Sequence, residues 1–149
     1  MQLGAELMAD ATTNQLRVRL VTPERVLFET LADSVDLPGK TGYLEPLYAH
    51  APLVSLLGAG DVIVHGGEQD GQRYNVNWGF VEVLPNRVTI LANDALKPEE
   101  IDVARAEKQL DRGHQEWKEA GESEDAYTEA LRVIAEAEAK IASAEPQKH

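Results

Sequence analysis

A carboxylate and a guanidinium stand three residues apart in the segment Ile101-Asp102-Val103-Ala104-Arg105-Ala106, at the expected start of a helix. This spacing places Asp102 and Arg105 near one helix face, and the first turn of a helix leaves backbone N–H groups without partners. Two interpretations follow: a small anion-binding site, or an ion pair on a solvated face. The pattern by itself favours the ion pair, because such pairs are common on exposed helices.

Histidine and cysteine offer little further chemistry. The chain has no cysteine, and its four histidines, His50, His65, His114 and His149, share no spacing typical of a metal site. Disulfides, thiolate nucleophiles and cysteine-ligated metals are therefore excluded. The sequence also lacks a Gly-x-Ser-x-Gly elbow, a Walker loop and a Gly-x-Gly-x-x-Gly run. We expect no catalytic residue, no metal and no resident cofactor.

The formal net charge of −12 at pH 7 narrows the possible partners. A strongly acidic chain is repelled by the phosphates of nucleic acids and by anionic lipids, so neither is expected as a direct partner. No run of about 18 apolar residues is present, and the first residues lack a basic region followed by an apolar core, so we expect neither a membrane span nor a signal peptide. Work at a membrane would then go through a partner.

The positioning element is a long, irregular stretch from Val35 to Leu53. It holds Pro38, Gly39, Gly42 and Pro46, which exclude a helix and restrict the backbone of a loop. A loop of defined shape on a β scaffold suits a contact site, and an ordinary long connection fits the same composition.

The chain before residue 95 is typical of a β domain. Leu16, Val18 and Leu20 alternate with two arginines, as in a half-buried strand. Strands about ten residues apart predict a flattened β-sandwich or barrel over residues 15–94. Gly79 indicates a bulge, and Gly58-Ala-Gly60 is interpreted as a turn. The other expected strands are 25–29, 34–37, 53–57, 61–65, 73–78, 79–84 and 87–92.

Residues 95–149 are interpreted as an antiparallel two-helix hairpin, and residues 1–14 as a disordered leader whose true start, Met1 or Met8, stays open. Pro98 suits a first helical turn, and apolar residues recur every three or four positions over 98–118 and 124–144. The fold class is therefore β plus α, a sandwich followed by a hairpin. The predicted seam is Val103, Ala106, Leu110, Gly113 and Trp117 against Tyr127, Ala130, Ile134, Ala137, Ile141 and Ala144.

Such a seam buries little apolar area, because alanine contributes far less than leucine. The ordering of the helices costs about 1–2 kcal/mol per residue. Both a readily detached arm and an ordinary docked hairpin fit this weak burial.

Several short segments carry a family resemblance. They are Leu37-Pro-Gly39, Gly42-x-Leu44, His50-Ala-Pro-Leu53, Gly79-Phe-Val-Glu-Val83, Asn86-Arg-Val-Thr-Ile-Leu91 and Ile101-Asp-x-x-Arg-Ala106. Each segment is weak alone. Together, and in this order over about residues 16–144, they resemble the epsilon subunit of bacterial F-type ATP synthase, which is called delta in mitochondria.

The resemblance implies a non-catalytic subunit of the rotating central stalk. Such a subunit links the gamma subunit to the c ring, couples proton transport to ATP synthesis, and in many bacteria restrains ATP hydrolysis when its helices extend toward the alpha/beta head, a transient contact. It implies a peripheral location on the cytoplasmic side of the bacterial inner membrane, reached only through the complex. Whether this hairpin inhibits hydrolysis, and which ion is pumped, stay open.

The resemblance also implies two groups of site residues. A loop that contacts the c ring and the gamma subunit corresponds to Thr41, Gly42, Tyr43, Leu44 and Glu45, with His50 beside it. Positions that bind ATP in some members correspond to Ile101, Asp102, Arg105, Ala106 and Arg112. ATP would be a regulatory ligand and not a cofactor.

Several positions depart from the family pattern. Glu45-Pro-Leu-Tyr-Ala49 replaces a Gly-Val-Leu-Pro-Gly run, and Tyr43 stands where an acidic residue is usual. In nucleotide-binding members an acidic residue stands at the position of Leu96, and arginines stand at the positions of Glu136 and Lys140. A glutamate in place of a phosphate-binding arginine reverses the charge there, so whether ATP binds stays open.

Two other functions fit parts of the sequence. A stand-alone nucleotide-sensing module would use the segment from Ile101 to Ala106. A small β-sandwich hydrolase with His50 as its base has the least support.

Overall fold

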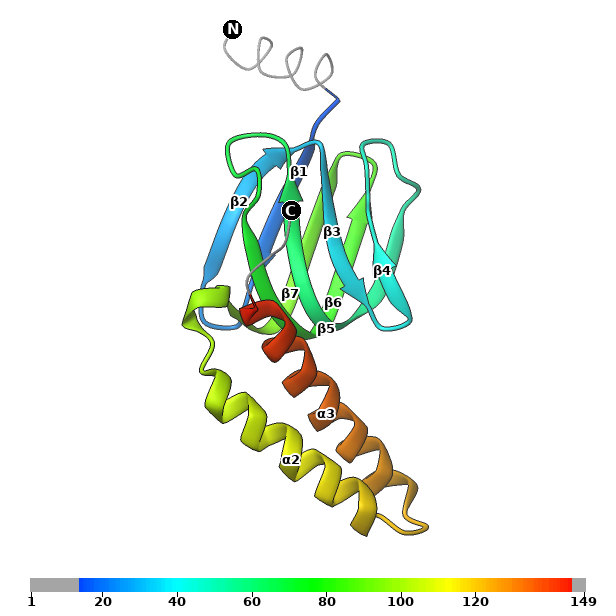
Figure 1. Cartoon of the computed structure of the whole chain (residues 1–149). Coiled ribbons are helices and arrows are strands. Elements are labelled where there is room, and N and C mark those ends of the chain that lie inside the picture. The colour runs from blue at the N-terminus through cyan, green and yellow to red at the C-terminus, as the bar shows by residue number, and fades with distance from the viewer. Residues whose placement is uncertain (1–13, 146–149) are drawn as a thin grey trace, which may run out of the picture.

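The computed structural model describes residues 14–145, so the expected leader lies outside the described residues except for Asn14. A β-sandwich is followed by two antiparallel helices (Figure 1), which confirms the expected fold class. The elements are β1 (Leu16–Val21), β2 (Val26–Ala32), β3 (Ser34–Gly39), β4 (Gly42–Leu44), β5 (Leu53–His65), β6 (Arg73–Leu84), β7 (Arg87–Leu96), a 3-10 helix η1 (Pro98–Glu100), α2 (Val103–Glu119) and α3 (Glu124–Ala144).

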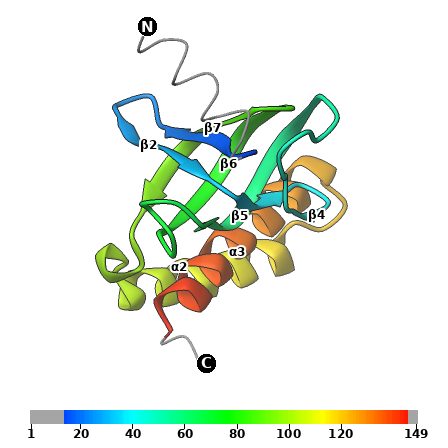
Figure 2. The same cartoon turned by 90° about the horizontal axis from the view of Figure 1, so that it is seen from above.

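The seven strands form one sheet in the order β2-β1-β7-β6-β5-β3-β4. Paired strands are antiparallel except β1 and β7, which run parallel. The sheet curls around its core, and both helices lie on one side of it (Figure 2). Leu16, Val18 and Leu20 are fully buried, as their alternation predicts. Valines from β3, β5, β6 and β7 make up half of the remaining core residues.

The prediction of two strands around Gly58-Ala-Gly60 is wrong, because β5 runs unbroken through these residues. These glycines allow β3 to lie close to β5, and they do not form a turn. A Cβ on Gly58 would lie 2.9 Å from the carbonyl oxygen of Gly39, and one on Gly60 would lie 2.9 Å from the Cβ of Pro38. Strand β3 can therefore lie tightly against β5 only if these side chains are absent.

Strand β6 changes which of its residues face the core at Gly79. The inward residues are Tyr74 and Val76 before this point, and Val81 and Val83 after it. Trp78 and Gly79 have φ values of 47° and 132°, so the backbone is irregular where the alternation shifts. The bulge that the sequence predicts at Gly79 thus turns Phe80 outward, where it is half exposed.

The first helix begins later than the sequence predicts. Pro98 opens the short helix η1, and α2 starts only at Val103. Asp102 is the N-cap residue, because its Oδ1 accepts a hydrogen bond from the backbone N–H of Arg105 at 3.1 Å. Capping by aspartate satisfies one of the unpaired N–H groups of the first turn. No ion pair between Asp102 and Arg105 is present among the described residues.

The helical seam is largely as predicted. Ala106, Gly113, Ala130 and Ala137 are buried, and the rings of Trp117 and Tyr127 pack across the hairpin with centroids 6.2 Å apart, although both side chains are partly exposed. Val103 is exposed, and the sequence did not predict the buried Val133 and Ser143. A Cβ on Gly113 would approach Ile134 Cγ1 to 2.8 Å, so the two helices lie close together there. Small residues set this close spacing, and the hairpin buries little apolar area, as expected.

Candidate functional site

The predicted contact segment, Thr41 to Glu45, forms the outer edge of the sheet. Gly42, Tyr43 and Leu44 make up β4, whose partners on β3 are Gly39, Pro38 and Leu37. The Tyr43 ring is exposed, and its hydroxyl accepts a hydrogen bond from the backbone N–H of Asp61 at 2.9 Å. The segment is therefore a short, anchored strand and not an irregular loop.

Glu45 and His50 lie in the connection between β4 and β5. Glu45 accepts a hydrogen bond from the Ser34 hydroxyl at 3.3 Å. The Nδ1 atom of His50 lies 2.6 Å from the carbonyl oxygen of Ala51. The backbone N–H of the preceding residue, Ala49, donates a hydrogen bond to the carbonyl oxygen of Pro85 at 2.6 Å. His50 thus lies toward the β6–β7 turn, and no hydrogen bond in the described structure joins it to the β4 residues.

A row of apolar side chains that the sequence did not predict crosses the outer surface of the sheet. The register places Leu56 beside Phe80, Phe80 beside Leu91, and Leu91 beside Val21. Their exposed fractions are 44% for Leu56, 54% for Phe80 and 48% for Leu91. We call these four residues the apolar row. The sequence contained one indication of this row: Phe80 lies two residues before the charged Glu82, so both side chains are on the same, outward face of the strand.

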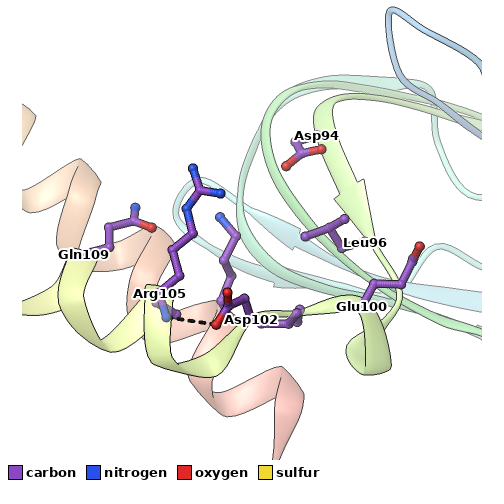
Figure 3. A pocket seen from close by; sticks show the side chains of 9 residues that line it. Asp94, Leu96, Glu100, Asp102, Arg105 and Gln109 are labelled. Carbon is purple, nitrogen blue, oxygen red and sulfur yellow. Dashed lines mark hydrogen bonds between the residues drawn. The ribbon is translucent and has the colours of Figure 1, made fainter.

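Four of the five predicted nucleotide-binding residues line one cavity of about 390 Å³ between β7, η1, α2 and α3 (Figure 3). Figure 3 shows the Arg105 side chain directed away from the carboxylate of Asp102, so its guanidinium is not held by that group. The lining residues are Asp94, Leu96, Glu100, Ile101, Asp102, Arg105, Ala106, Gln109 and Lys140.

The charges around this cavity suit an anion poorly. Three carboxylates, Asp94, Glu100 and Asp102, stand against two cations, Arg105 and Lys140. Asp102 is already engaged as a helix cap. The fifth predicted residue, Arg112, does not line the cavity, and its Nε lies 3.5 Å from Glu116 on the solvated side of α2.

A polar junction fastens the hairpin to the sandwich. The indole N–H of Trp78 on β6 donates to the carboxylate of Glu136 on α3, and Gln109 on α2 donates to the second oxygen of Glu136 at 3.1 Å. The guanidinium of Arg132 lies over the Trp78 ring, 4.9 Å from its centroid. One glutamate therefore joins the strand to both helices.

A second set of contacts holds the C-terminal half of α3. Asn75 donates to the carbonyl oxygen of Ala139 at 3.3 Å, and Arg73 donates to that of Ser143 at 3.1 Å. Helix α3 thus carries the main contacts with the sheet.

None of the helices described is long and apolar enough to cross a membrane.

The fold and these surfaces define a β-sandwich protein with a docked C-terminal helical hairpin. Residues 15–98 match the family model of the ATP synthase delta/epsilon chain β-sandwich domain. The chain therefore belongs to the ATP synthase delta/epsilon family, as the resemblance indicated.

Curated relatives agree with this assignment. The ATP synthase epsilon chain of Koribacter versatilis is 42% identical over 102 residues, which cover 68% of this chain and 71% of the relative. That of Solibacter usitatus is 38% identical over 131 residues, covering 87% and 96%.

Solved structures share the fold at low identity. A chain of the Euglena gracilis mitochondrial ATP synthase, in an OSCP/F1/c-ring structure, has a TM-score of 0.74 at 19% identity and covers 89% of this chain and 82% of its own. One from the Tetrahymena thermophila central stalk and c ring has a TM-score of 0.66 at 13% identity, covering 87% and 96%.

Proposed function

We propose that this chain is the non-catalytic rotor subunit of an F-type ATP synthase, which joins the gamma subunit to the c ring and couples proton transport to ATP synthesis. The observation that carries the proposal is the apolar row on adjacent strands of the sheet, in which Leu56, Phe80 and Leu91 are exposed and Val21 is partly buried. Aligned apolar side chains on an ordered sheet mark a surface that a partner covers. Membership of the delta/epsilon family supports this reading.

The two surfaces suit different partners. The apolar row offers a flat, rigid face for the gamma subunit, and a rigid face transmits torque without deforming. The β4 segment, with Tyr43 fixed by Asp61, offers a narrow edge for the c ring. The subunit would reach the cytoplasmic side of the membrane only through these partners.

Replacing Phe80 by aspartate tests the apolar row. A central aromatic in an interface typically contributes about 2 kcal/mol or more, so Phe80→Asp should weaken binding to the purified gamma subunit by about 30-fold or more. The matched control is Leu131→Asp, an exposed leucine on α3 outside the row. Surface plasmon resonance measures both affinities, and circular dichroism verifies the fold. Equal affinities of Phe80→Asp and the unmodified chain would refute the role of the row.

We also propose that the hairpin acts as a brake on ATP hydrolysis once it leaves the sandwich and touches the alpha/beta head. The small seam and the few polar contacts at the junction support a low docking energy. A two-state element of this kind can shift between docked and extended forms with small changes in free energy.

ATP as a regulatory ligand is a second candidate, favoured by one observation: the cavity that gathers Ile101, Asp102, Arg105 and Ala106. Because carboxylates outnumber cations there, we expect affinity no tighter than about 1 mM. Arg105 is the exposed cation in the cavity, whereas Arg112 faces Glu116. Arg105→Gln should therefore weaken binding of Mg–ATP in an NMR titration, and Arg112→Gln should not. Equal effects of the two variants would contradict this cavity as the site.

A further inference from the structure

Three potential metal ligands converge on the outer surface of the sheet, apart from the cavity and the apolar row. Asp36 lies on β3, Glu45 follows β4, and His65 ends β5. One ligand atom from each lies within 4.8 Å of the others. Asp36 alternates with the buried Val35 and Leu37, and His65 follows the buried Val64, so both side chains point away from the core.

Contacts already present hold these side chains together. His65 Nε2 and Asp36 Oδ2 are 2.9 Å apart, and both side chains are partly exposed, so an ion can reach them from solvent. The Ser34 hydroxyl donates to Glu45 at 3.3 Å and turns that carboxylate toward β3. The strand pairing of Ser34 with His65 fixes the relative position of the two segments. Much of the ordering needed for binding has thus taken place on folding.

The local charge favours a cation. His65 Nε2 contacts the Asp36 carboxylate, and the charges of Asp36, Glu45 and Asp70 act on the imidazole ring. All the charges acting on the ring in this way are carboxylates. None of these charged groups would therefore repel a cation bound among them.

We propose that Asp36, Glu45 and His65 bind one Zn²⁺ ion. One imidazole nitrogen and two carboxylate oxygens are ligands that zinc accepts, and a water molecule would complete a tetrahedral set. The imidazole makes Mg²⁺ and Ca²⁺ poorer candidates, because both prefer oxygen ligands.

The geometry needs only small changes. Zinc–ligand distances of about 2.0–2.1 Å place tetrahedral ligand atoms roughly 3.3 Å apart. The contact between His65 and Asp36 must open by a few tenths of an ångström, and Glu45 must move inward. The Glu45 side chain is exposed, and its hydrogen bond from Ser34 must lengthen or break as it moves. Bound zinc would tie the β4–β5 connection to β3 and β5, and so would steady the contact segment that ends at Glu45.

Isothermal titration calorimetry of the full chain with zinc chloride, at mildly alkaline pH, tests the site. We expect one ion per chain with micromolar affinity, and at least a roughly tenfold loss of affinity in His65→Gln. The matched control is His114→Gln, which removes an exposed histidine of α2 and should bind zinc as the unmodified chain does. Asp36→Asn provides a second variant if His65→Gln is unstable by circular dichroism.

Cobalt gives an independent readout. Co²⁺ in a four-coordinate site absorbs strongly in the visible region, and this absorption should appear with the unmodified chain and with His114→Gln, but not with His65→Gln. Lack of stoichiometric zinc binding by the unmodified chain would overturn the proposal. So would zinc binding that survives His65→Gln and Asp36→Asn but is lost in His114→Gln.

Discussion

Replacing Gly79 by alanine should lower the free energy of unfolding by about 3 kcal/mol or more. Gly79 has a φ of 132°, a conformation that side chains rarely adopt, and an added Cβ would collide with the carbonyl oxygen of Leu91 on β7. Backbone strain of this kind costs about 1–3 kcal/mol. Displacement of β7 would add to this loss, because it disturbs the hydrogen bonds between β6 and β7.

Urea unfolding measures the effect as a lower transition midpoint at unchanged slope. The matched control is Gly71→Ala. Gly71 also has a positive φ, 85°, but no atom lies within 4 Å of an added Cβ, so only the backbone term of about 1 kcal/mol applies. If the two variants lost equal stability, the collision with Leu91 would contribute nothing, and close packing of β6 on β7 would not be the reason for glycine at this position.

The sequence predicted the parts of the fold that follow from local alternation. Leu16, Val18 and Leu20 are buried as expected, and Gly79 marks the bulge. The prediction of a turn at Gly58 and Gly60 was wrong, because a single sequence does not distinguish a glycine that forms a turn from one that lets two strands lie close together. Only the position of β3 against β5 distinguishes the two.

The site was predicted less completely, for a related reason. The segment from Ile101 to Ala106 is local and could be recognised, and four of its residues do line one cavity. The apolar row depends on strand register across β5, β6, β7 and β1, which is a property of the assembled sheet. The junction of Trp78 with Glu136 joins residues 58 positions apart in the sequence, so no local pattern announces it.

Strand β6 connects both surfaces of the proposed rotor subunit. Trp78 holds the hairpin, and Phe80, two residues later, belongs to the apolar row. The backbone is irregular at Trp78 and Gly79, where the set of residues that face the core changes. Because of this irregularity, Trp78 and Phe80 both point away from the core although they lie on one strand. A shift of β6 caused by a partner at Phe80 would therefore be felt at the hairpin junction without any relay through the core.

Replacing Trp78 by alanine should release the hairpin. The variant removes the indole hydrogen bond to the charged Glu136, a type of bond that contributes about 1.5–3 kcal/mol, and the contact with Arg132, which contributes about 0.5–1 kcal/mol. Glu136 keeps its bond from Gln109, and Arg73 and Asn75 still hold α3, so part of the docking energy remains. We expect a net loss of about 2 kcal/mol, which raises the undocked population about 30-fold.

Energy transfer between two dyes measures that population. The chain has no cysteine, so Glu24→Cys on the β1–β2 turn and Glu122→Cys on the α2–α3 turn give two unique labelling positions. Trp78→Phe is the matched variant, because it keeps a ring for Arg132 but removes the N–H donor, and it should show an intermediate population. In the assembled enzyme, Trp78→Ala should lower ATP hydrolysis if the extended hairpin is the brake, and a chain ending at Lys97, which keeps β7 whole, should raise it. An undocked population unchanged by Trp78→Ala would show that the contacts of Arg73 and Asn75 alone hold the hairpin. Hydrolysis that stays constant while the population rises would separate release of the hairpin from inhibition.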